Sequence, residues 1–336
     1  MQKKVFFRCD ASKEVGLGHL TRCVSLAFIL KNDFQICFLF KAPSVHSIGF
    51  LNESFQFIEL KDGDLQEEAA EVKGLVNAED ILVIDGYQFS DEYFSSLSNN
   101  AIKLVLIDDF GKEYSQASVV INHALGLSDT HEPSSTKYCL GEKYVMLRPP
   151  FLLKAKQIRV IEKVKNVFVC FGGADYHNIT LKVLQAFVEA EKNLQIHVVL
   201  AATFPFKEEV EEFVKQSGLN CRLHYNLQAA KMAELMGDCE VAVSPASGLS
   251  YEICAVGMGF IGGYYIDNQI GIHNGLLERG CMLSVGDYSK FNNSSFFNLV
   301  NKLLENNAML NELIVAQRKV VDGESDKTIL NVFSLL

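Results

Sequence analysis

The feature that most limits the fold of this sequence is its repeated alternation of short, continuously apolar segments with helical patterns. A strand that is apolar along its whole length is typical of a parallel sheet covered on both faces. In the first half we expect such strands at Val5–Arg8, Gln35–Phe40, Ile81–Ile84, Lys103–Ile107 and Ser118–Ile121, with helices between them over 20–31, 66–76 and 90–97. The pattern therefore predicts an α/β domain with a doubly wound, Rossmann-like sheet.

The pattern breaks at Leu147–Phe151 and starts again with a strand at Asn166–Phe171. The second half repeats the same order of strands and helices, with further strands expected at Gln195–Ala201, Cys221–His224, Glu240–Ser244 and Phe260–Tyr264. Its last long helical segment, Asn292–Leu313, is expected to pack back across the domains. With 336 residues the chain is long enough for two domains, which we place at 1–150 and 151–336. We expect two Rossmann-like domains that face each other across a cleft, lined by the carboxyl ends of the strands, where such sheets bind ligands.

Composition excludes several classes of protein. The net charge of -10 argues against a broad nucleic-acid surface, because an acidic protein gains nothing from counterion release. The nine cysteines form no C-x-x-C pair, which fits free thiols in a reducing cytoplasm. No apolar run of about 18 residues is present, so no membrane insertion is expected. Met1 is followed by lysines and a strand rather than by a signal peptide, and we expect a cytoplasmic monomer or small homo-oligomer.

A glycine-containing turn lies between the first expected strand and the first expected helix. Gly16 and Gly18 let the backbone approach a ligand, and the N–H groups of the first helical turn can then meet a phosphate or sugar oxygen. His19 falls in that turn, where the helix dipole disfavours imidazolium, so we expect a neutral ring that can accept a proton from water. Asp10 can orient this ring or contact a sugar. The alternative is a tight turn in which His19 only caps the helix.

Arg22, one turn further along the same helix, either points at the ligand or forms a surface ion pair. In the second half, Gly172, Gly173 and Asp175 follow a strand and precede a helix. This turn either contacts a ligand or uses Asp175 or Asn178 as a helix N-cap.

The segment Ser247-Gly248-Leu249 opens another helix, whose N-terminus can hold a diphosphate. Glu252, one turn in, can accept hydrogen bonds from ribose hydroxyls. The alternative is that Glu252 only complements the helix dipole.

Polar residues follow two further strands. Tyr87 stands in Asp85-Gly86-Tyr87, and Asn268 and Gln269 lie between a strand and a helix. Asp108-Asp109 suggests a metal site, but no third ligand stands at a suitable spacing. We interpret this pair as the turn at the end of a strand, with contact to a substrate as the alternative.

Taken together, these stretches resemble the PseG family, the UDP-2,4-diacetamido-2,4,6-trideoxy-β-L-altropyranose hydrolases of the bacterial pseudaminic acid pathway. The resemblance runs from residue 3 to about 285 and keeps the order of the motifs. The motifs that carry it are Arg8-Cys9-Asp10-Ala11-Ser12, Gly16-Leu17-Gly18-His19, Asp85-Gly86-Tyr87, Phe171-Gly172-Gly173-Ala174-Asp175 with Asn178, Ser247 with Glu252, and Asn268-Gln269. The family has the GT-B architecture.

The resemblance implies roles for several residues. His19 corresponds to the histidine that acts as the catalytic base in the family, and Tyr87 and Asn268 are expected to line the active site. By likeness to UDP-binding GT-B proteins, Ser247, Gly248 and Leu249 present N–H groups to the diphosphate, Glu252 holds the ribose, and uracil lies near Leu223–Leu227. Gly248 and Tyr251 depart from the common form, which bears on the nucleotide contacts rather than on the class.

The implied reaction is attack of water on the anomeric carbon of a UDP-sugar, with inversion and release of UDP. His19 takes the proton of the water, and neither a metal nor a cofactor is required. Two alternatives use the same motifs: a GT-B glycosyltransferase that passes the sugar to an acceptor, and a non-catalytic UDP-sugar-binding protein. The histidine of the G-x-G-H motif favours hydrolysis over mere binding, because a binding protein needs no base there.

Overall fold

The computed structural model describes residues 2–9, 18–51, 54–98, 102–129, 135–172, 175, 177–189, 193–202 and 204–336. The chain divides into two compact units. Unit 1 consists of Met1–Pro149 together with Glu324–Leu336, and unit 2 of Pro150–Gly323. The first division falls where the sequence pattern breaks, whereas the last residues of the chain belong to unit 1 and not, as expected from the sequence, to the second domain.

Unit 1 is built on a seven-stranded parallel sheet in the order β3-β2-β1-β4-β5-β6-β7. The order reverses between β1 and β4, as in a doubly wound fold. The strands are β1 (Lys4–Cys9), β2 (Gln35–Lys41), β3 (Gln56–Leu60), β4 (Ile81–Asp85), β5 (Lys103–Ile107), β6 (Val119–Asn122) and β7 (Lys137–Leu140). The helices are α1 (Gly18–Leu30), α2 (Val45–Phe50), α3 (Leu65–Leu75), α4 (Asp91–Ser98) and α13 (Ser325–Ser334), with a short 3-10 turn at Glu142–Tyr144.

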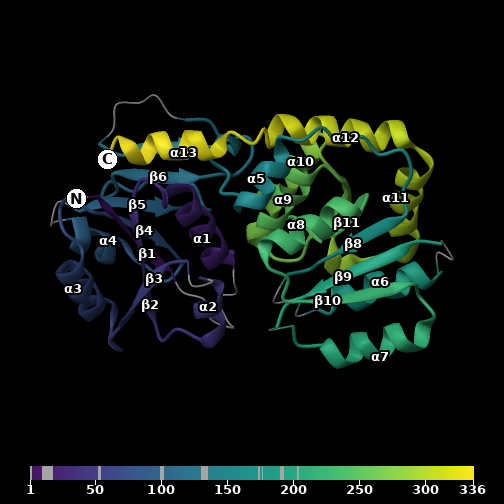
Figure 1. Cartoon of the computed structure of the whole chain (residues 1–336), viewed down its shortest axis with the longest axis horizontal. Coiled ribbons are helices and arrows are strands. Elements are labelled where there is room, and N and C mark those ends of the chain that lie inside the picture. The colour runs from purple at the N-terminus through teal and green to yellow at the C-terminus, as the bar shows by residue number, and fades with distance from the viewer. Residues whose placement is uncertain are drawn as a thin grey trace. The chain divides into compact units, whose positions relative to one another are not determined.

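Helices cover both faces of this sheet, which is why its central strands are mostly apolar (Figure 1). In β1, Val5 and Phe7 face the core under α1 and α13, whereas Phe6 faces the core under α3 and α4. The helix α13 returns from the far end of the chain and buries Phe333 against Phe34 of unit 1. This contact explains why the end of the chain belongs to unit 1.

Unit 2 repeats the design with a six-stranded parallel sheet in the order β10-β9-β8-β11-β12-β13. The strands are β8 (Asn166–Val169), β9 (Gln195–Leu200), β10 (Cys221–Tyr225), β11 (Val241–Pro245), β12 (Gly259–Tyr264) and β13 (Leu283–Asp287). The helices are α5 (Pro149–Ala155), α6 (Ile179–Glu189), α7 (Lys207–Ser217), α8 (Ala229–Asp238), α9 (Gly248–Val256), α10 (Ile270–Glu278), α11 (Asn293–Glu305) and α12 (Asn307–Val320), with 3-10 turns at Asp267–Gln269 and Tyr288–Lys290. The two Rossmann-like sheets confirm the predicted fold class.

The reversal of strand order places particular loops together. Cys9, at the end of β1, is paired with Asp85, at the end of β4. The loop after β1 leads to α1, so the first turn of α1 lies beside the end of β4. In unit 2, the equivalent reversal between β8 and β11 brings the turn after β8 beside the start of α9. Ligands of doubly wound sheets bind at these reversal points.

Candidate active site

His19 lies in the first turn of α1, as the sequence predicts, and is almost fully buried. Its Nδ1 is 2.5 Å from Oδ1 of Asp85. Two lone pairs cannot approach so closely, so Nδ1 carries a proton and donates it to the carboxylate. This fixes the tautomer and leaves the lone pair on Nε2. A carboxylate that holds Nδ1–H orients the ring and stabilises the imidazolium that forms when Nε2 accepts a proton.

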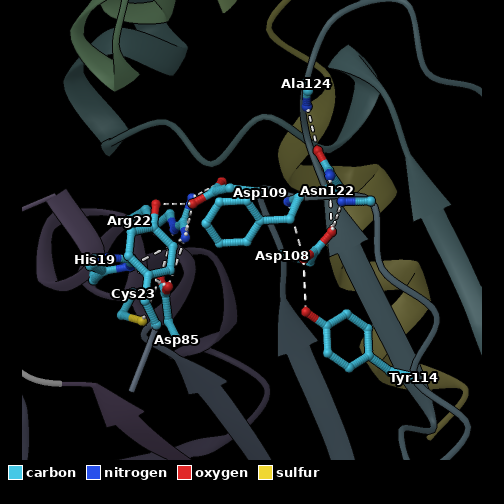
Figure 2. Close-up of polar contacts among 12 residues, drawn as sticks. His19, Arg22, Cys23, Asp85, Asp108, Asp109, Tyr114, Asn122 and Ala124 are labelled. Carbon is cyan, nitrogen blue, oxygen red and sulfur yellow. Dashed lines mark hydrogen bonds and ion pairs between the residues drawn. The ribbon is translucent and has the colours of Figure 1, made fainter. Parts of the chain in front are cut away.

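Arg22, one turn along α1, joins two carboxylates (Figure 2). It donates to Asp85 through Nε at 2.6 Å and a terminal nitrogen at 2.7 Å, and to Asp109 through both terminal nitrogens at 2.6 and 2.9 Å. The terminal nitrogen that donates to Asp85 also lies 3.3 Å from Nδ1 of His19. The two do not form a hydrogen bond, because this nitrogen can only donate and Nδ1 already carries a proton. Arg22 therefore forms ion pairs, as one of the two alternatives predicted. These pairs are largely buried, whereas the prediction placed an ion pair on the surface.

The charges of this network hold one another ionised. Burial alone raises the pKa of Asp85 and Asp109, but the Arg22 guanidinium outweighs it and holds both pKa values below their ordinary range. Burial likewise disfavours the charge of Arg22, and the two carboxylates reverse this effect and raise its pKa. The carboxylate beside His19 is therefore an anion over the whole physiological pH range.

Tyr87, which follows β4, covers the other side of the histidine. Its ring packs edge-on against His19, with ring centroids 4.5 Å apart, and its hydroxyl donates to Asp109 at 2.7 Å. Phe110 packs against the same tyrosine at a centroid distance of 5.0 Å. Both rings are half exposed, so an aromatic surface lies next to the catalytic candidate.

Asp108 has a different role from its neighbour Asp109. Its carboxylate accepts hydrogen bonds from the backbone N–H groups of Phe110 and Gly111, from the hydroxyl of Tyr114 and from the side-chain amide of Asn122 (Figure 2). This carboxylate holds the turn after β5, as the sequence analysis expected of the pair. Asp109 is thereby aimed at Arg22.

His123 follows β6 and is buried. Burial, together with the positive charge of Arg22, lowers the pKa of His123 to about 4, so this imidazole is neutral at physiological pH. Neither His123 nor the orienting role of Asp85 was predicted from the sequence. The signal for Asp85 was present, since it ends a buried strand immediately before Tyr87.

In unit 2, the start of α9 has the geometry expected of an anion-binding helix end. Ser247 is the N-cap, and its backbone N–H donates to Oγ of Ser250 at 3.0 Å. Gly248 and Leu249 are the first helical residues, whose N–H groups have no acceptor within the helix. Glu252 lies further along this helix and is nearly buried.

The remaining candidates of unit 2 have mixed surroundings. Asp175 is fully buried and accepts hydrogen bonds from the backbone N–H groups of Ile179 and Thr180, which is the capping alternative. Gln269 is buried, and its carbonyl accepts from the N–H of Tyr265. Asn268 is exposed beside it. Gly172 has φ +77°, with open space where a Cβ would stand, so the loop after β8 needs glycine for its backbone conformation.

Three of the predicted site residues, Asp10, Gly16 and Gly173, lie outside the described residues. Gly18 is the exposed first residue of α1. Within the described part of the chain, no three His, Cys, Asp or Glu side chains converge as a metal site requires. None of the helices described is long and apolar enough to cross a membrane.

No family profile matches the sequence. It is 25% identical over 285 residues to the UDP-2,4-diacetamido-2,4,6-trideoxy-beta-L-altropyranose hydrolase of Campylobacter jejuni, covering 82% of this chain and 97% of that protein. It is 23% identical to the spore coat polysaccharide biosynthesis protein SpsG of Bacillus subtilis, covering 97% and 96%. An uncharacterized protein of Methanocaldococcus jannaschii is 26% identical over 76% of this chain, which spans only 54% of that longer protein. The chain is thus a distant homologue of these proteins.

Solved structures resemble the whole chain. MurG of Acinetobacter baumannii superposes with a TM-score of 0.67 at 13% identity, covering 99% of this chain and all of that one. The UDP-GlcNAc 2-epimerase of Neisseria meningitidis, solved with UDP-GlcNAc, gives 0.66 at 11% identity and 99% and 100% coverage. The Anabaena protein HepE, solved with UDP-glucose, gives 0.62 at 13% identity with the same coverage. The chain has the GT-B fold.

Proposed function

We propose that this protein hydrolyses a UDP-linked 2,4-diacetamido-2,4,6-trideoxyhexose to UDP and the free sugar, as a step of pseudaminic acid biosynthesis. The observation that carries the proposal is the contact between Nδ1 of His19 and the buried carboxylate of Asp85. A histidine that only caps a helix has no need of a buried anion behind its ring. The distant similarity to the Campylobacter jejuni hydrolase supports the substrate class.

In the proposed reaction, water attacks the anomeric carbon while Nε2 of His19 takes its proton. Asp85 keeps the proton on Nδ1 and stabilises the imidazolium. The C–O bond to the diphosphate breaks, and UDP leaves with the bonding electrons. General-base catalysis of this kind contributes about 10²–10⁴-fold to the rate.

In the same proposal, unit 2 binds the nucleotide. The N–H groups of Gly248 and Leu249 hold the diphosphate and stabilise the charge that grows on it as it leaves. Glu252 accepts hydrogen bonds from the ribose, and Asn268 and Gly172 border the substrate. Asp175 is not assigned to the substrate site, because its carboxylate already caps α6.

The test is to incubate the purified protein with a panel of UDP-2,4-diacetamido-trideoxyhexoses in buffer without any acceptor. We expect equal amounts of UDP and free sugar from at least one member. Turnover that appears only after an acceptor is added would identify a glycosyltransferase instead. Tight binding of the whole panel without release of UDP would identify a binding protein.

A further inference from the structure

A pocket of about 280 Å³ opens at the carboxyl edge of the sheet of unit 1. Its walls come from the loop after β4, from the first turn of α4 and from the end of β5 with the loop that follows. Its lining includes Tyr87, Phe89, Asp91, Glu92, Phe110 and Lys112. None of the roles proposed above uses this pocket as a whole.

The pocket lies next to His19, because one residue contacts both. Tyr87 forms part of its wall and also packs against the ring of His19. Phe110, on the other side of Tyr87, continues the aromatic wall. Tyr87 therefore adjoins both the ring of His19 and the pocket.

The polar groups of the pocket are of two kinds. Asp108 and Asp109 are already engaged, the first by its own turn and the second by Arg22 and Tyr87. The exposed carboxylates of Asp91 and Glu92, in the first turn of α4, supply hydrogen-bond acceptors. The ammonium of Lys112 lies over the ring of Phe110, 5.7 Å from its centroid, and supplies a donor.

The exposed lining of the pocket is mostly polar, and apolar side chains also line it. Phe89, Phe94 and Leu106 are buried, whereas the rings of Tyr87 and Phe110 are half exposed. The pocket thus combines exposed aromatic rings with carboxylate acceptors and a cationic donor. An N-acylamino group has the matching parts: an N–H donor, a carbonyl acceptor and an apolar chain.

Size limits the ligand further. A volume of about 280 Å³ lies just below the usual range for sites that enclose a whole ligand, roughly 300–1,000 Å³. It is too small for a nucleotide sugar. The pocket is also larger than one acetyl group. An acetyl group has three heavy atoms and fills only a few times the volume of a water, which is about 30 Å³.

We propose that this pocket binds an N-acylamino substituent of the sugar and accepts acyl chains longer than acetyl. Lys112 donates to the acyl carbonyl, the first turn of α4 accepts from the amide N–H, and the acyl chain lies against the exposed ring of Phe110. The inference rests on the proposed function, which it extends by naming the part of the substrate that this pocket selects.

The experiment compares three kinds of substrate: the UDP-diacetamido sugar, counterparts with butanoyl in place of acetyl at one nitrogen or the other, and counterparts with a free amine at that nitrogen. The wild-type protein is expected to convert one butanoyl substrate with a KM no higher than that of the diacetamido sugar. Lys112→Met is expected to raise KM about tenfold for acylated substrates with little change in kcat, because a hydrogen bond made equally in the ground and transition states is lost. The free-amine substrate should show no such change.

The matched control is Lys103→Met, which removes an exposed lysine at the opposite end of β5. Phe110→Ala should raise KM for the butanoyl substrate more than for the diacetamido sugar. If Lys112→Met changes KM equally with and without the acyl group, or not at all, this inference fails while hydrolysis stands. If the wild-type protein releases no UDP from any substrate, the proposed function fails and this inference fails with it.

Discussion

The replacement Asp85→Asn tests the pairing of His19 with its carboxylate. Asp85 accepts three short hydrogen bonds, one from His19 and two from Arg22. The oxygen that accepts from Nδ1 of His19 also accepts from a terminal nitrogen of Arg22, and the other oxygen accepts from Nε of Arg22. An asparagine has one acceptor oxygen and no charge, so in either orientation its NH₂ faces a donor of Arg22. The imidazolium that forms when Nε2 of His19 accepts a proton also loses its counter-anion.

The base is weakened in this variant although the ring stays in place, because no anion stabilises its protonated form. We expect kcat to fall by about 10²–10⁴-fold, the range for loss of general-base catalysis, with KM little changed. The free energy of unfolding should also fall by about 3 kcal/mol, the lower end for breaking a buried ion pair, since Arg22 keeps its two bonds to Asp109. The assays are steady-state UDP release and calorimetric unfolding.

Asp109→Asn is the matched control, because it removes the same charge from Arg22 without touching His19. It should lose similar stability, but its loss of kcat should be at least about tenfold smaller than that of Asp85→Asn. If Asp85→Asn keeps kcat within about tenfold of the wild-type value, or if both variants lose kcat equally, Asp85 does not orient the base.

Two further predictions concern single residues, and a third concerns the reaction. The pKa of His123 is lowered from 6.5 to about 4, so the unfolded chain binds one more proton between these values and stability falls as pH falls through them. Between pH 7.5 and 5, the free energy of unfolding should therefore fall by about 2 kcal/mol less in His123→Gln than in the wild-type protein. Parallel curves of unfolding temperature against pH for the two proteins would contradict this. Glu252→Gln should weaken UDP binding about tenfold in titration calorimetry through loss of a charged acceptor, and an unchanged Kd would remove Glu252 from the ribose site. Hydrolysis in ¹⁸O-labelled water should give unlabelled UDP, and label in UDP would mean attack at phosphorus.

The sequence predicted the central strands of both sheets but missed three strands at their edges. The missed strands are β3, β7 and β13, which lie at sheet ends. An edge strand is covered less completely, so its sequence carries more polar residues, as the mostly exposed β3 shows. The continuous apolar pattern that identifies a buried strand is therefore weak where burial itself is incomplete.

The candidate site was predicted in part for a related reason. The place of His19 in the first turn of α1 follows from a local pattern, and the structure confirms it. The role of Asp85 depends on which strand pairs with β1, and sequence order alone does not give that pairing. The return of α13 to unit 1 is likewise a long-range packing event, stabilised by Phe333.

The most direct test of the account is the pair of measurements made on His19→Asn: the Kd for UDP and the rate of UDP release from the hydrolysed substrate. Because the nucleotide is assigned to unit 2 and the base to unit 1, we predict an unchanged Kd and a turnover reduced by about 10²–10⁴-fold. Near-normal turnover in this variant would contradict the assignment of His19 as the base.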